Sequence, residues 1–279
     1  MITRLTQLAR LLLTTGGFLF FYVGAVLLSW LLLPLLRRRG GTPAERSALS
    51  RRLVGAGFRL FHDYLRVMQL VRFDPRELAP RLPPGKFVFV ANHPTLVDVT
   101  ALIAAQVDTT CVVKGRLFRS AALGRLLRYC WHIDGGGSRL AGGDGVVPAG
   151  VQRLAAGVPV LIFPEGSRSP EGGLRSFKRG AFEIACRAEA TVVPLFITCS
   201  PAVLAKEAPW YRVPPTVPRL QVIVLPRMDP TSWQGDSRAM AKDARAGYLR
   251  LLAGEELGQW QPTQPARRDD TSQTGGRKP

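Results

Sequence analysis

Cysteine and histidine are scarce in this chain of 279 residues, which has 4 Cys and 3 His. The cysteines show no CxxC spacing, so the sequence carries neither a zinc-ribbon pattern nor a dithiol redox motif. We expect buried free thiols, as in a reducing compartment, and no metal site. The cysteines are Cys111, Cys130, Cys186 and Cys199.

An obvious covalent nucleophile is also missing. No GxSxG elbow occurs around Ser167 or elsewhere. Cys130 and His132 are neighbours in the sequence, but apolar surroundings disfavour the thiolate that a cysteine nucleophile needs. We therefore expect a general base that acts directly on a substrate hydroxyl.

Acidic residues are few: 20 Asp and Glu stand against 38 Lys and Arg, and the formal net charge is +18. A charge of this size implies an anionic partner, such as nucleic acid, an anionic membrane surface or an acidic carrier protein. The chain has no zinc-finger spacing and no glycine-rich aromatic block of the RNA-binding kind. We expect anionic membrane lipids and no nucleic acid, although a basic nucleic-acid-binding membrane protein remains an alternative that rests on charge alone.

A long run from Leu11 to Leu36 is almost free of charge, and Arg37, Arg38 and Arg39 follow it at once. Its length suits a helix that crosses a bilayer, and the arginines favour a cytoplasmic main body. A re-entrant or interface-lying helix and a signal peptide are the alternatives, although the run is long for a signal peptide and no cleavage pattern follows it.

A second helix is predicted from Thr42-Pro43-Ala44-Glu45, which has the pattern of a capping box with proline at the first helical position. It should run to about Val71. Apolar residues fall broadly on one side and arginines are interspersed, which suits an anionic membrane surface or, equally, a core-packing helix with a solvated basic face. The apolar residues are Leu49, Leu53, Leu60, Leu65 and Met68.

Apolar runs with strand-forming residues alternate with helical patterns from about residue 74 onward. This alternation predicts an α/β fold, a layered and mostly parallel sheet flanked by helices. We divide the chain into an N-terminal membrane anchor (1–40), a basic amphipathic helix (41–73), a catalytic domain (74–258) and a disordered tail (259–279). The predicted strands are 86–90, 110–113, 158–163, 191–197 and 220–225, and the predicted helices are 96–106, 117–129, 147–156, 177–188 and 237–252.

An imidazole and a carboxylate follow the first of these strands in Asn92-His93-Pro94-Thr95-Leu96-Val97-Asp98. A neutral histidine is a general base near physiological pH, and a carboxylate on its other nitrogen fixes the tautomer. The first helical turn could bring Asp98 back beneath His93. A histidine that merely caps a helix would show the same pair.

Glu165, Gly166 and Arg168 stand on a turn after another strand, in Phe163-Pro164-Glu165-Gly166-Ser167-Arg168. The glycine allows a ligand close to the backbone, and the forked guanidinium matches phosphate. Lys178 follows at the start of a helix, whose amides also favour anions. Ligands bind at the carboxyl ends of strands in such sheets, so we expect both segments on one side of the sheet. Alone, this turn could be a charged surface turn.

Together, the His93–Asp98 block and the later FPEGSRS block resemble the glycerolipid acyltransferase superfamily, of the lysophosphatidate acyltransferase type. Val193-Pro194-Leu195-Phe196 resembles a late block of the same family, and the resemblance covers about residues 85–225. It implies a fatty acyl donor, either acyl-CoA or acyl-carrier protein, and a lysolipid acceptor. His93 with Asp98 would be the base, and the acceptor would lie on Glu165, Gly166, Ser167 and Arg168. No cofactor is implied.

Two departures from the family pattern bear on the acceptor. Family members often carry an arginine after an apolar-Asp segment, and the resemblance implies that this arginine helps to hold the acceptor phosphate. This chain has Gly135-Gly136-Gly137 after Asp134, and the nearest arginine is Arg139. Pro94-Thr95 stands where many family members have a different residue followed by serine. Thr95 keeps the side-chain hydroxyl of that serine. We expect a membrane-bound enzyme of phospholipid biosynthesis at the cytoplasmic membrane, with its catalytic domain facing the cytoplasm, that acylates a lysophospholipid such as 1-acyl-glycerol 3-phosphate. An amino- or glycolipid acceptor, or an inactive lipid-binding protein, is the alternative.

Overall fold

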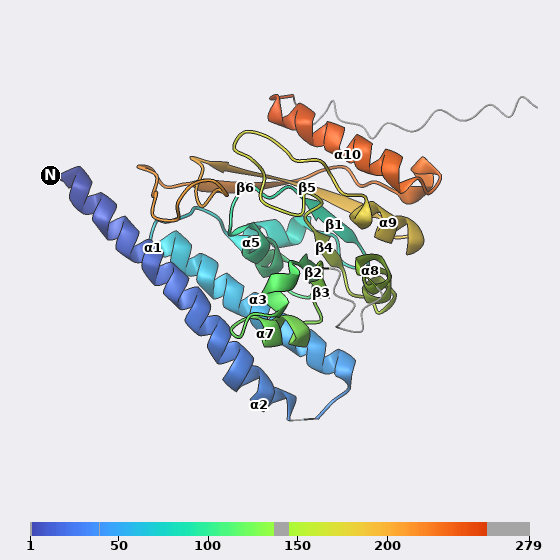
Figure 1. Cartoon of the computed structure of the whole chain (residues 1–279), viewed down its shortest axis with the longest axis horizontal. Coiled ribbons are helices and arrows are strands. Elements are labelled where there is room, and N and C mark those ends of the chain that lie inside the picture. Colours follow the sequence, from blue (N-terminus) through green and yellow to red (C-terminus); the bar gives the residue numbers. More distant parts are fainter. Residues whose placement is uncertain (1, 39, 137–144, 256–279) are drawn as a thin grey trace, which may run out of the picture.

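A computed structural model describes residues 2–38, 40–136 and 145–255. It contains a six-stranded sheet in the order β3-β2-β4-β1-β5-β6, with helices on both faces and a long N-terminal helix along one side (Figure 1). The predicted mostly parallel α/β sheet is thus confirmed. The strands are β1 (Val88–Ala91), β2 (Thr110–Val113), β3 (Ile133–Asp134), β4 (Val160–Ile162), β5 (Val192–Ser200) and β6 (Arg219–Val224).

The helices connect the parallel strands and cover the sheet. Those before the sheet are α1 (Ile2–Leu27), the π-helix η1 (Leu28–Leu32), α2 (Leu33–Arg37), α3 (Pro43–Val67), α4 (Pro75–Leu78) and the 3-10 helix η2 (Ala79–Arg81). Those within and after it are α5 (Asp98–Ala105), α6 (Gly115–Phe118), α7 (Gly124–Tyr129), α8 (Val146–Ala155), α9 (Gly180–Arg187), η4 (Pro230–Trp233) and α10 (Ser237–Leu252).

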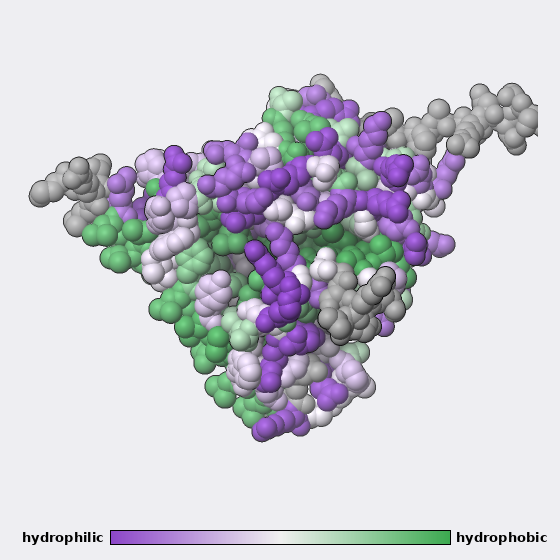
Figure 2. Space-filling model, in the orientation of Figure 1, coloured by the Kyte–Doolittle hydropathy of each residue, from purple (hydrophilic) through white to green (hydrophobic). Residues whose placement is uncertain are grey.

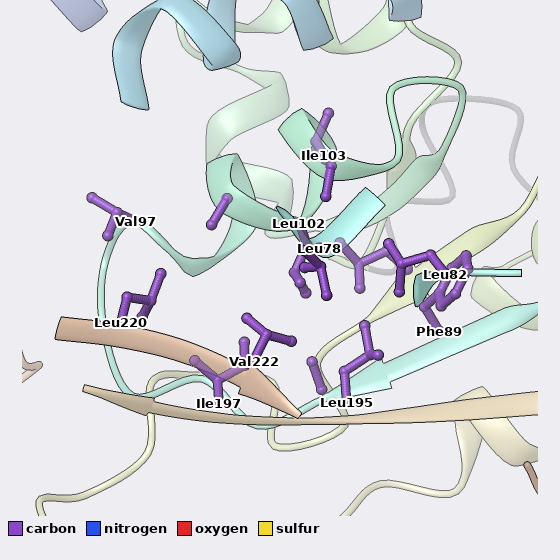
Figure 3. Close-up of a cluster of buried hydrophobic side chains, with 14 of the residues drawn as sticks. Leu78, Leu82, Phe89, Val97, Leu102, Ile103, Leu195, Ile197, Leu220 and Val222 are labelled. Atoms are coloured by element: carbon purple, nitrogen blue, oxygen red, sulfur yellow. The ribbon is translucent and has the colours of Figure 1, made fainter. Parts of the chain in front are cut away.

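The central strand β1 pairs in parallel with β4 on one side and β5 on the other, and β2 pairs in parallel with β4 and β3. Only β5 and β6 pair antiparallel among the described strands. Successive residues of a strand point to opposite faces. Phe89 and Ala91 therefore pack with α3, α4 and α5, whereas Val88 and Val90 pack with α8, α9 and α10. Figure 3 shows side chains of the first of these two cores, with Leu102 on the helix side and Phe89 and Leu195 on the sheet side.

The N-terminal apolar segment forms α1, η1 and α2 in direct succession, and its stretch from Gln7 to Leu36 is long and apolar enough to cross a membrane. Gly16 and Gly17 do not break the helix. A Cβ atom at Gly16 would lie 2.9 Å from the hydroxyl of Tyr64, so this glycine permits close packing of α1 on α3. The π-turn ends just before Pro34, which has no N–H to give to an α-helical bond.

Helix α3 begins with the predicted capping box, in which Glu45 N–H donates to the Thr42 hydroxyl and Thr42 N–H to the Glu45 carboxylate. It ends at Val67, four residues before the predicted end near Val71. Its buried side differs from the predicted one, because Leu60 is 60% exposed whereas His62 is buried. The helix lies between α1 and α5, so the predicted core-packing role is confirmed. The predicted role at a membrane surface stays a prediction, and the exposed Leu60 is compatible with it.

The predicted continuous helix over 117–129 is wrong. The chain forms α6 and α7 with a turn between them, and a Cβ atom at Gly124 would lie 2.2 Å from the carbonyl oxygen of Phe118. Glycine therefore lets the second helix fold back onto the end of the first. The two-residue strand β3 was not predicted, and the predicted tail beyond 258 lies outside the described residues.

Candidate active site

Three neighbouring parallel strands deliver polar residues to the same edge of the sheet. β1 ends just before Asn92 and His93, β4 leads into the turn at Glu165, and β2 leads into Lys114. Parallel strands share one carboxyl-terminal edge, which is where ligands bind in sheets of this kind. Both predicted blocks therefore lie on one side of the sheet, as expected.

His93 and Asp98 are in contact. Nδ1 of His93 lies 2.8 Å from Oδ2 of Asp98, which is fully buried, whereas the histidine side chain keeps 16% exposure. The ring of Phe163 lies against the imidazole, with 4.4 Å between centroids. The carboxylate holds Nδ1 and leaves Nε2 as the nitrogen that can take a proton from a ligand.

Thr95 holds the carboxylate in place. Its backbone N–H donates to Oδ2 of Asp98 at 2.7 Å, and its hydroxyl donates to Oδ1. The same hydroxyl accepts the N–H of Val97. The hydroxyl of Thr95 thus positions Asp98, which in turn holds the imidazole of His93.

The side chain of Asn92 fixes the strand end that carries His93. Its amide donates to the carbonyl of Ile197 at 2.8 Å, and its carbonyl accepts the N–H of Ile197 at 2.6 Å. Both bonds are buried and reach the neighbouring strand β5. The asparagine therefore continues the sheet pairing by one residue at the point where the backbone turns away.

Glu165 is 5% exposed, and both of its oxygens are used by the protein. Oε1 accepts from the hydroxyl of Ser169 at 2.6 Å and from the N–H of His93 at 3.2 Å, and Oε2 accepts from the N–H of Arg175 at 2.8 Å. Ser169 N–H in turn donates to the carbonyl of His93 at 2.7 Å. The carboxylate joins the turn to the histidine rather than pairing with Arg168.

A cavity of about 790 Å³ opens in front of His93. One part of its wall is apolar and comes from α1, α3 and α5, including Phe18, Phe21, Phe61 and Ile103. The other part is basic, and no Asp or Glu belongs to the described lining. Its cations are Lys114, Arg116, Arg168, Lys178, Arg179, Lys206 and Arg212.

These cations affect one another. The pKa of Lys114 is lowered by partial burial and by the charges of Arg116, Lys206, Arg168 and Lys178. Burial also lowers the pKa of Arg168, whose guanidinium donates to the carbonyls of Leu204 and Ala205. A group of cations held together without a carboxylate is suited to an anion of more than one charge.

The remaining residues of the predicted site are distributed unevenly. Gly166 and Ser167 line the cavity, and the Gly166 backbone has φ of +67°, with the Lys178 side chain against it. Arg168, which was predicted to bind the acceptor, also lines the cavity and donates to the carbonyls of Leu204 and Ala205. Arg139 lies outside the described residues. Sequence reasoning missed Lys114, Arg116 and Ser169, although Lys114 follows a predicted strand just as His93 does.

Cys111 and His132 do not form a second reactive centre. His132 is buried and its Nδ1 accepts the N–H of Cys111, while burial lowers its pKa to about 3 and raises that of the Cys111 thiol to about 12. A neutral thiol beside a neutral imidazole is not a nucleophile. Within the described ranges no group of His, Cys, Asp and Glu could hold a metal ion.

The chain is similar to known proteins in sequence and in fold. A family model described as "Acyltransferase" matches residues 71–198. The 1-acyl-sn-glycerol-3-phosphate acyltransferase alpha of Mus musculus is 28% identical over 83% of this chain and 79% of its own length. A 1-acyl-sn-glycerol-3-phosphate acyltransferase of Chlamydomonas reinhardtii is 32% identical over 40% of this chain and 34% of its own. The crystal structure of the 1-acyl-sn-glycerophosphate acyltransferase PlsC from Thermotoga maritima has the same fold, with a TM-score of 0.65 and 19% identity, and covers 90% of this chain and 97% of its own.

Proposed function

We propose that this chain, which belongs to the glycerolipid acyltransferase superfamily, transfers a fatty acyl group to the free hydroxyl of a lysophospholipid such as 1-acyl-glycerol 3-phosphate. One observation carries the proposal. The His93–Asp98 pair faces a cavity that is basic in one part and apolar in another. A lysolipid with a phosphate head and one acyl chain has the same two chemical ends.

In the proposed reaction, Nε2 of His93 removes the proton from the acceptor hydroxyl as its oxygen attacks the thioester carbonyl of the donor. The C–S bond then breaks, and the leaving thiolate takes the proton from the imidazolium. Asp98, fully buried and bonded to Nδ1, stabilises the imidazolium while it exists. The donor is the thioester of acyl-CoA or of acyl-carrier protein.

The cations beside His93 would hold the acceptor phosphate. Lys114 and Arg116 follow β2, and Lys178 and Arg168 follow β4, so cations from two neighbouring strand ends converge. We propose them, with the backbone around Gly166 and Ser167, as the acceptor site. Glu165 supports that site from behind through His93 and Ser169. Arg139 is retained as a candidate for the contact that Gly135 cannot make.

We propose that the N-terminal helix formed by α1, η1 and α2 lies at the membrane interface beside the body and does not cross the bilayer. Near one end Arg10 donates to the carbonyls of Pro214 and Thr216, and near the other Trp30 donates to Ala121. These positions are separated by ~30 Å of helix, about the thickness of the bilayer core. A crossing helix would draw the body into hydrocarbon. The membrane is proposed to be the cytoplasmic one, with the domain facing the cytoplasm.

The test is an acyl-transfer assay with labelled acyl-CoA and acyl-carrier protein against a panel of lysophospholipids, amino-lipids and glycolipids. Transfer to lysophosphatidate that His93→Ala abolishes is the expected result. Transfer to a lipid without a terminal phosphate would move the acceptor to the alternative class that Gly135 suggests, and Arg139→Ala would then have little effect. Lipid binding without transfer in any combination would leave only a binding protein.

A further inference from the structure

The loop between β5 and β6, residues 201–218, exposes two aromatic side chains next to α1. Trp210 is 47% exposed and Tyr211 is 60% exposed. Tyrosine and tryptophan combine an apolar ring with a polar group, and they concentrate where lipid hydrocarbon meets water. The orange segment beside the N-terminal half of α1 in Figure 1 is this loop.

The loop is attached to α1 at more than one point. The ring of Trp210 meets that of Phe18 edge to face, with 5.7 Å between centroids, and Arg10 donates to Pro214 and Thr216. Neighbouring residues of α1 present large apolar side chains, since Leu19 is 65% exposed. Figure 2 shows green, hydrophobic side chains along this side of the molecule. The exposed aromatics therefore continue an apolar surface that already belongs to α1.

The same loop borders the catalytic cavity. Trp210, Arg212 and Val213 line it opposite Thr14, Gly17 and Phe18 of α1. At its other end, Leu204 and Ala205 accept hydrogen bonds from Arg168 on the active-site turn. One short segment thus connects the active-site turn, the cavity wall and the membrane helix.

The charges of the loop fit a phospholipid surface. Lys206 and Arg212 are exposed and flank the aromatic pair, and Arg10 adds a third cation at the junction with α1. The one carboxylate of the loop, Glu207, lies 3.9 Å from Arg175. Cations beside interfacial aromatics are attracted to anionic head groups. A polar protein partner would not need two exposed rings that continue the apolar face of a helix.

We propose that the 201–218 loop is a second membrane-contacting element, which seats Trp210 and Tyr211 in the head-group layer of an anionic phospholipid bilayer. The cavity wall shared by this loop and α1 then faces the lipid, and the lysolipid reaches His93 laterally from the bilayer. The route of the lysolipid rests on the proposed function. Contact of the loop with lipid does not depend on turnover.

The experiment compares two labelled full-length chains in phosphatidylcholine–phosphatidylglycerol vesicles. Tyr211→Cys and Lys242→Cys each carry a nitrobenzoxadiazole label, and the labelled chain without an added cysteine gives the background. Lys242 is exposed on α10, on the opposite side of the molecule from α1 in Figure 1. A head-group nitroxide lipid should quench the label at 211 and not at 242, and aqueous cobalt ion should do the reverse.

Equal quenching at both positions, or protection at 211 that requires a second copy or acyl-carrier protein instead of lipid, would overturn the proposal. A turnover measurement adds an independent arm. Tyr211→Asp should slow acylation of a vesicle-borne lysolipid about ten-fold, equivalent to about 1.4 kcal/mol, and spare a short-chain acceptor dissolved as monomers. Tyr211→Trp should retain both rates. A wild-type chain without turnover would refute the proposed function. The quenching result would still show whether the 201–218 loop contacts lipid.

Discussion

The backbone N–H of His93 and the carboxylate of Glu165, 72 positions apart in the chain, are joined at 3.2 Å. Ser169 closes the link, since it donates to the same carboxylate oxygen and its N–H donates to the carbonyl of His93. The proposed base is therefore held through its main chain by one block and through its imidazole by Asp98. The position of the proposed base therefore depends on hydrogen bonds within the protein, and not only on residues that would contact a ligand.

Glu165→Gln should lower turnover and stability together. The Glu165 carboxylate now accepts from the Ser169 hydroxyl and from the Arg175 N–H. In the variant, the amide nitrogen of glutamine would replace one of these acceptors and leave that donor without a partner. Leaving a buried donor unsatisfied costs about 1–3 kcal/mol. Thermal unfolding and acceptor kinetics measure this, with kcat falling more than the acceptor KM rises. A raised KM at unchanged stability would instead mean that Glu165 binds the acceptor directly.

His93→Ala should reduce turnover by ~10²–10⁴-fold, the usual effect of losing a general base. Asp98→Asn should keep the fold and impair the rate, since the amide cannot stabilise the imidazolium or fix the tautomer in the same way. Unfolding curves control for damage to the Thr95 turn. A folded His93→Ala chain with near-normal turnover would exclude the mechanism.

Lys114→Met should raise the KM for lysophosphatidate and leave the donor KM less affected. A charge-assisted hydrogen bond is worth about 1.5–3 kcal/mol, which is ~10–100-fold in affinity. Lys242→Met removes one positive charge on α10, far from the cavity lining, and is the matched control. If both variants behave alike, the effect belongs to net charge and not to the basic wall.

Gly124→Ala should destabilise the chain by about 1–3 kcal/mol, the usual cost of an added methyl group where space is closed. Its Cβ would lie 2.2 Å from the carbonyl oxygen of Phe118. Gly180→Ala is the control, because nothing lies within 4 Å of the Cβ it would add. Chemical denaturation measures both. Equal stability of the two variants would mean that α6 and α7 separate at little cost.

Tags at the two ends of the chain should be found on the same side of the membrane. The reason is that the N-terminal helix formed by α1, η1 and α2 is hydrogen-bonded to the rest of the protein through both Arg10 and Trp30. Protease protection of N- and C-terminal tags in sealed cells reports the side of each, and an outer N-terminus would restore the crossing helix. Carbonate washing measures how firmly the helix is inserted.

Residues adjacent in sequence were the predictable part of the site. The His93–Asp98 contact follows from a strand end, a proline and one helical turn, and the edge of the sheet follows from parallel pairing. Lys114 and Arg116 were missed because their place depends on β2 lying beside β4, a strand order that no local pattern encodes. The hydrogen bonds of Glu165 were not predicted for a related reason, since its donors include Arg175 and Ser169, which only the folded turn brings to it.

In α3, too, the locally determined feature was predicted and the feature that depends on other helices was not. The capping box at Thr42 and Glu45 is local and was predicted correctly. The buried side of α3 was not predicted correctly, because it is set by α1 and α5 together. Gly16 and Gly17 of α1 allow that packing and do not kink the helix.

Because α1 supplies part of the cavity wall, it is not an interchangeable anchor. Deleting it, or exchanging it for an unrelated hydrophobic helix, would open the cavity as well as remove the proposed membrane contact. Chimaeras between relatives should therefore function only when α1, α3 and the 201–218 loop come from the same parent. Under the proposed function, evolutionary change in the length or shape of the acyl chain that the cavity accepts has to alter these segments together.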